Sequence, residues 1–139
     1  MSLERAKLAN ALRWIGVLPG TLLGGWLAWI LVNGLNRSTF AWQGIDPDSF
    51  FSRVFIEGVS HGALGAASVY VGARLAPSHK RVVVLILAAL LLVGAGFLLF
   101  PAIMLRDWWA VYGGGGLVVG AVGVAWSIYA RDLSESGFG

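Results

Sequence analysis

Four long apolar stretches dominate this sequence. The clearest of them begins at Val82 and reads VVVLILAALLLVGAGFLLF, without a charged residue. The hydrocarbon core of a bilayer is about 30 Å thick, so a helix that crosses it needs roughly 20 mainly apolar residues. Stretches of this length lie at residues 14–32, 54–76, 82–105 and 108–130. The sequence therefore predicts an all-α integral membrane protein, a bundle of four transmembrane helices.

The composition agrees with this prediction. Hydrophobic residues make up 58% of the 139 residues and charged residues only 12%, whereas a soluble domain carries about 25% charged residues. The chain has no Cys, which excludes disulfides, thiolate catalysis and cysteine-bound metals. Because no Pro- or Ser-rich linker divides the sequence, we expect residues 1–139 to form a single transmembrane domain.

The positions of Lys and Arg predict the orientation of the four spans. If the N-terminus is inside, the cytoplasmic side holds Arg5, Lys7, Arg13, Arg74, Lys80, Arg81 and Arg131, and the outer side holds Arg37, Arg53 and Arg106. Cytoplasmic loops carry the excess of basic residues, so we expect both termini in the cytoplasm and the chain in a bacterial inner membrane. The net charge of +3 reflects this bias. The basic residues are scattered over short loops, which argues against a nucleic-acid partner.

The longest connection runs from residue 34 to residue 53, and it is unusually apolar for a free loop. Within it, Asp46-Pro47-Asp48 is typical of a helix start, with an acidic cap followed by Pro at the first helical position. We therefore predict a short interfacial helix there, whose Phe side chains enter the headgroup region. This connection would either fold over the mouth of the bundle without a further role or act as a lid or docking surface.

Glycines recur at helical spacing in the first, second and fourth spans. Helices in lipid associate by close backbone contact at small residues. We expect such helix-packing contacts at Gly16, Gly20, Gly24, Gly58, Gly62, Gly65, Gly116 and Gly120. The third span has only Gly94 and Gly96, so we expect it to be the most exposed to lipid. Contacts within one chain and contacts between subunits are both open at this point.

The second span contains the two ionisable residues that interrupt the apolar pattern. Glu57 and His61 are four residues apart, which places them on one face of a helix, and Ser68 continues the same stripe. Ionisable side chains inside a membrane are expensive and mark functional sites by default. Glu57, His61 and Ser68 therefore form the predicted intramembrane polar site.

Three roles for this polar site are open. The first is a structural hydrogen-bonded pair, with Ser60 or Asn33 as further partners. The second is a protonatable site, in which Glu57 and His61 pass protons or cations along a pathway. The third is ligation of a metal or haem. One His and one Glu are too few for zinc, and haem would need a second axial ligand from another subunit. We therefore expect no metal and no cofactor.

The sequence contains no recognisable catalytic set. Serines near His61 lie on its own helix and cannot form a nucleophile–base–orienter arrangement, and there is no HExxH motif or aspartate pair. The leading hypothesis is a non-enzymatic accessory or assembly subunit of a membrane complex, with the bilayer and a homo-oligomer or larger complex as its partners. The alternative is a proton- or cation-linked transporter or channel subunit. A haem- or quinone-binding electron-transfer subunit is a more distant hypothesis.

Overall fold

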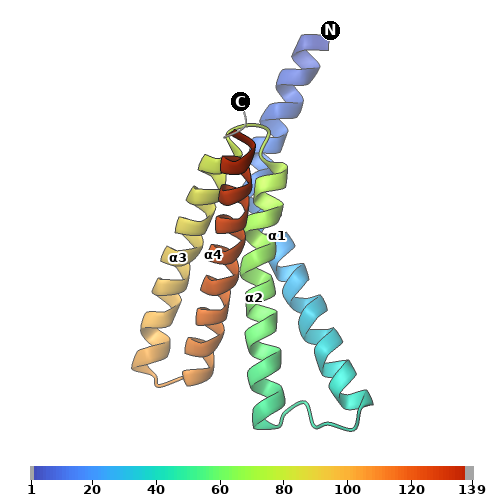
Figure 1. Cartoon of the computed structure of the whole chain (residues 1–139). Coiled ribbons are helices and arrows are strands. Elements are labelled where there is room, and N and C mark those ends of the chain that lie inside the picture. The colour runs from blue at the N-terminus through green and yellow to red at the C-terminus, as the bar shows by residue number, and fades with distance from the viewer. Residues whose placement is uncertain (1, 137–139) are drawn as a thin grey trace.

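The computed structural model describes residues 2–136, with the side chains of residues 4–131. This part of the chain contains four helices and no strand. The helices are α1 (Ser2–Trp42), α2 (Phe50–Leu75), α3 (Lys80–Met104) and α4 (Trp108–Ser136). Each is long and apolar enough to cross a membrane. The prediction of an all-helical protein with four such helices is confirmed, and Figure 1 shows them running antiparallel with both termini at one end.

Helix α1 is much longer than its predicted span of 14–32. It has 41 residues, or about 60 Å at 1.5 Å per residue. The helix continues without interruption through Pro19 and Gly34. Figure 1 shows its N-terminal end extending beyond the other helices, and its two halves running in different directions.

The predicted interfacial helix between the first two spans is wrong. Helix α1 takes up most of that segment and ends in a glycine-terminated motif, in which Gly44 adopts φ +73°. The Ile45 N–H donates to Phe40 O at 2.9 Å, and the Gly44 N–H donates to Ala41 O at 3.1 Å. These bonds satisfy the carbonyls at the end of the helix, and glycine tolerates the left-handed backbone that they require.

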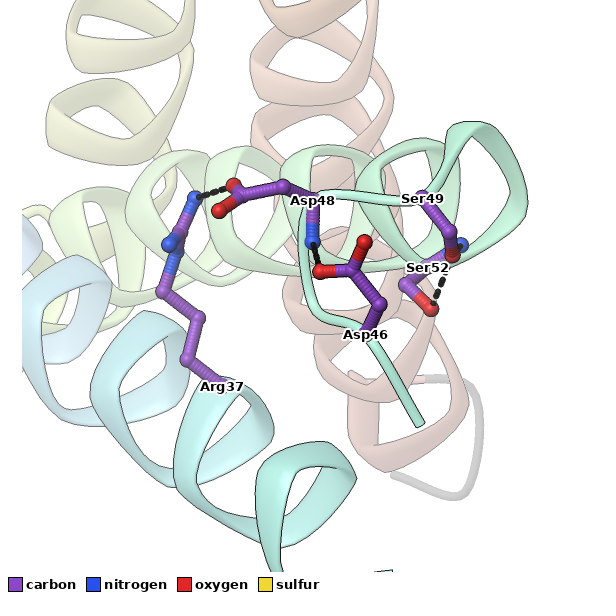
Figure 2. Close-up of polar contacts among 5 residues, drawn as sticks. All are labelled: Arg37, Asp46, Asp48, Ser49 and Ser52. Carbon is purple, nitrogen blue, oxygen red and sulfur yellow. Dashed lines mark hydrogen bonds and ion pairs between the residues drawn. The ribbon is translucent and has the colours of Figure 1, made fainter. Parts of the chain in front are cut away.

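The Asp46-Pro47-Asp48 segment forms a turn and not a helix start. The Asp46 carboxylate accepts the Asp48 N–H at 2.9 Å, so this acidic side chain closes the turn instead of capping a helix. The cap of α2 comes from Ser49, whose Oγ accepts the Ser52 N–H and lies 2.8 Å from the Ser52 Oγ. Figure 2 shows these contacts, together with the exposed ion pair between Arg37 and Asp48.

Helix α2 occupies the centre of the structure. Its backbone lies close to those of the other three helices, whereas the backbone of α1 lies close to that of α2 alone and α3 also lies close to α4. The expectation that the third span is the most exposed is therefore wrong. Helix α3 buries six residues, while the described side chains of α1 include only Val17, Thr21 and Gly25 in the buried class. Alanine and valine provide the close contacts of α3, so its scarcity of glycine is no sign of isolation.

The apolar core consists of two clusters near the end that carries both termini. One cluster contains Val69, Ala73, Val84, Ala88, Ala121 and Ala125, and the other contains Val17, Ala76, Val83 and Leu87. Most of these side chains are small, so the helix backbones approach closely, as in membrane bundles generally. Glu57 and His61 lie in the opposite half of α2 and are separate from both clusters.

Candidate functional site

The structure brings Glu57 and His61 together. The Nδ1 of His61 lies 2.8 Å from the carbonyl oxygen of Glu57 and 3.3 Å from the Glu57 Oε2. A carbonyl can only accept, so Nδ1 carries a proton in this arrangement. About a quarter of each side chain is exposed, 23% for Glu57 and 27% for His61.

Two other helices contribute to the surroundings of His61. The Trp29 ring of α1 meets the imidazole edge-on, with 6.0 Å between ring centroids. Gly113 of α4 lies against the imidazole from another side, because a Cβ there would be only 3.0 Å from the His61 Cε1. The candidate site therefore lies where α1, α2 and α4 meet.

Sequence reasoning missed both Trp29 and Gly113 as parts of this site. The run Gly113–Gly116 was the available signal, and the structure gives three of its members different neighbours. Gly113 faces His61, Gly114 faces Leu99, and Gly116 faces the backbone of Gly58. Trp29 gave no signal of this kind, because Trp is common near the ends of membrane spans.

Ser68 does not join Glu57 and His61. It lies seven residues beyond His61, about 10 Å along the helix, and it is 2% exposed. Its Oγ lies against Gly25 of α1, where an added Cβ would overlap it. Ser68 thus belongs to the contact between α1 and α2.

The two further partners considered for the pair do not bind it either. Ser60 is fully buried, but its Oγ has no hydrogen-bond partner among the described residues. Among the described residues, Asn33 forms no hydrogen bond with Glu57 or His61. The Trp29 Nε1 is a second buried polar atom without a partner there. Unsatisfied buried groups of this kind each cost about 1–3 kcal/mol.

Five of the predicted packing glycines lie at the contact between α2 and α4, namely Gly58, Gly62, Gly65, Gly116 and Gly120. A Cβ at Gly120 would overlap the carbonyl of Gly62, and one at Gly65 would overlap the carbonyl of Leu117. A Cβ at Gly116 would be 3.1 Å from the Gly58 O. Backbone atoms cannot rotate away as side chains can, so the two helices approach closely only because these positions lack a Cβ.

The other predicted glycines have different surroundings. Gly20 faces the Leu75 side chain of α2, and Gly24 faces Val71 of the same helix. A Cβ at Gly16 would meet no atom within 4 Å, so this glycine makes no such contact within the chain. Gly25, which the spacing argument overlooked, faces both Ser68 and the Leu64 carbonyl.

Within the described residues, no group of three or more His, Asp or Glu side chains is placed to hold a metal ion. His79, the second histidine, lies at the start of α3, far along the chain from Glu57. No model of a protein family, no curated protein and no solved structure matches this chain. A function for this chain is therefore inferred from its residues and their geometry.

Proposed function

We propose that this chain is a polytopic membrane protein that acts without catalysis, as an accessory or assembly subunit of a membrane complex. In this proposal α1 is the helix that binds the partner. Both termini lie in the cytoplasm, as the distribution of basic residues favours.

One observation supports this proposal most directly, namely that the backbone of α1 lies close to that of α2 alone among the described helices, while Val17 shares an apolar cluster with Val83 and Leu87 of α3. Most of its circumference is therefore available to a partner. Large apolar side chains project from it along much of its length and are at least 60% exposed: Leu8, Leu12, Ile15, Leu22, Leu23 and Trp26. Gly16 and Gly34 also have open space where a Cβ would lie, and small residues of this kind allow a second helix to approach.

Substitution of these open glycines tests the proposal. Gly16→Leu and Gly34→Leu place a bulky side chain on α1 at positions where the added Cβ has no described atom within 4 Å. We expect both variants to keep their thermal unfolding midpoint and to lose a co-purifying membrane protein in mild detergent. Gly96→Leu is the matched control, because Gly96 of α3 is equally open and lies away from α1.

The outcome against the proposal is equally clear. If Gly16→Leu and Gly34→Leu retain every component that the unsubstituted chain retains, α1 is not the partner-binding helix. If the unsubstituted chain purifies only as copies of itself, the accessory function is wrong.

A second candidate function is proton or cation movement through the Glu57–His61 pair. The observation that favours it is the partial exposure of two protonatable groups in direct contact, in the half of α2 away from both core clusters. A transport site must exchange protons with its surroundings, and the partial exposure of both side chains permits this exchange.

Proton flux in liposomes tests this second candidate. We expect Glu57→Gln and His61→Ala each to slow the dissipation of a pH gradient at least tenfold. His79→Ala is the matched control, because His79 is exposed and bonds only Ser78 among the described residues. Equal rates for all three variants would exclude transport through this pair.

A further inference from the structure

Two adjoining apolar grooves lie between α2 and α4, beside the connection at residues 105–107. One has a volume of about 300 Å³ and is lined by Phe50, Val54, Trp108, Trp109 and Tyr112. The other has a volume of about 260 Å³ and is lined by Phe51, Val54, Phe55, Gly58, Val59 and Tyr112. Val54 and Tyr112 line both, so the two grooves form one path, which we call the α2–α4 groove.

The α2–α4 groove begins at the first turn of α2 and runs inward along that helix. From Phe51 to Val59 it covers nine residues, a rise of about 12 Å along the helix. Gly58 shapes its floor, because a Cβ there would be 2.6 Å from the Tyr112 hydroxyl. The missing side chain lets the hydroxyl end of Tyr112 approach the α2 backbone.

A cation lies at the outer end of the groove. The Arg53 guanidinium stacks over the Trp109 ring at 4.4 Å from its centroid, and Phe50 packs edge-on against the same ring at 5.9 Å. Arg53 is exposed, and its guanidinium has no carboxylate or hydrogen-bond partner among the described residues. Arg37, at the same end of the bundle, is instead paired with Asp48 at 3.0 Å. Stacking holds the Arg53 guanidinium in place and leaves its N–H donors available.

We propose that the α2–α4 groove binds a glycerophospholipid, with its phosphate on Arg53 and one acyl chain along the apolar path. This inference rests on the proposed location of the chain in a membrane. A guanidinium matches the geometry of a phosphate and binds it through two parallel hydrogen bonds. The first turn of a spanning helix lies at the depth of the headgroups, and the apolar residues below it lie at the depth of the acyl chains.

The combination of the two features selects this ligand. A free phosphate would use Arg53 but not the apolar path. A second copy of the chain would need a helix to enter a path that two helices already border closely. A phospholipid satisfies both the cation and the groove.

Native mass spectrometry of the delipidated full chain in detergent tests the proposal. The probes are palmitoyl-oleoyl phosphatidylglycerol and the diacylglycerol with the same acyl chains. We expect one phosphatidylglycerol to remain bound per chain and no diacylglycerol. Arg53→Gln should reduce the bound fraction about tenfold or more, as loss of hydrogen bonds to a charged group implies. Arg53→Lys should restore part of it, and Gly58→Leu should reduce it by filling the groove.

Arg37→Gln is the matched control and should bind as the unsubstituted chain does. Equal binding by Arg53→Gln, or equal binding of diacylglycerol, would overturn the proposal. So would a lipid-free dimer that Arg53→Gln dissociates. Resistance to alkaline carbonate extraction is measured first for every variant. If the unsubstituted chain is released by carbonate, the proposed membrane function fails, whereas a membrane-resident chain with unchanged Arg53→Gln binding refutes only the lipid site.

Discussion

His61 of α2 lies directly against Gly113 of α4, so that a methyl group at Gly113 would be 3.0–3.1 Å from three atoms of the imidazole ring. The position of the only histidine within the predicted spans thus depends on a missing side chain on another helix. The ring also contacts its own helix through Glu57 and α1 through Trp29. A side chain added at Gly113 should therefore displace the His61 imidazole ring.

We predict that Gly113→Ala shifts the NMR resonances of the His61 imidazole and leaves those of His79 unchanged. The added methyl group requires the ring to move by a few tenths of an ångström. Gly115→Ala is the control, because a Cβ at Gly115 meets nothing within 4 Å. That variant should keep both histidine spectra and gain up to about 1 kcal/mol of helix stability. Unchanged His61 resonances in Gly113→Ala would show that the two residues are not in contact.

We predict that Gly120→Ala lowers the free energy of unfolding by about 2 kcal/mol, within the range for overpacked contacts. Its new methyl group would meet the Gly62 carbonyl, which belongs to the backbone and cannot rotate away. Gly123→Ala on the same helix has open space and should be neutral or slightly stabilising. Unfolding in SDS, followed by circular dichroism, measures both variants. Equal stability of the two would contradict the close approach of α2 and α4.

The Glu57–His61 pair should show a measurable coupling energy. A double-mutant cycle with Glu57→Gln, His61→Ala and the combined variant isolates the pairwise contribution. Polar contacts between residues in membrane proteins contribute about 0.6 kcal/mol on average and up to about 1.7 kcal/mol, and we expect a value within this range. Strictly additive losses of stability would mean that the two side chains do not interact.

Ser60→Ala should leave stability unchanged or increase it. The Ser60 Oγ is fully buried without a hydrogen-bond partner, so its removal relieves an unsatisfied group. Ser52→Ala is the matched control on the same helix, since the Ser52 Oγ lies 2.8 Å from Ser49, the N-cap residue of α2. That change should cost about 1 kcal/mol, as loss of capping contacts does. A larger loss for Ser60→Ala than for Ser52→Ala in thermal unfolding would show that Ser60 has a partner.

The four long apolar helices could be predicted from the sequence, because the length of an apolar stretch indicates a helix able to cross a bilayer. The end of α1 at Trp42 could not be predicted from the sequence. The polar residues Asn36 and Thr39 are typical of a loop. In the structure, however, each side chain donates a hydrogen bond to the carbonyl four residues earlier on its own helix. Polar residues that satisfy themselves in this way do not stop a helix, and only the motif at Gly44 does.

The candidate site could be predicted only along one helix. The i,i+4 spacing placed Glu57 beside His61, since that distance is fixed by helical geometry. Trp29 and Gly113 come from other helices, and their alignment depends on how those helices cross α2. The same crossing separates Ser68 from the pair, because α1 covers that part of the stripe at Gly25.

The native composition of the complex tests the central claim most directly. The chain is extracted from its own membrane in mild detergent, its mass is determined, the co-purifying proteins are identified and an absorption spectrum is recorded. The proposed accessory function predicts a second protein in fixed ratio and no visible absorption. A colourless homo-oligomer of this chain alone would contradict it, and proton flux through Glu57 and His61 would then become the leading function. A coloured preparation that His61→Ala bleaches would instead establish a haem site.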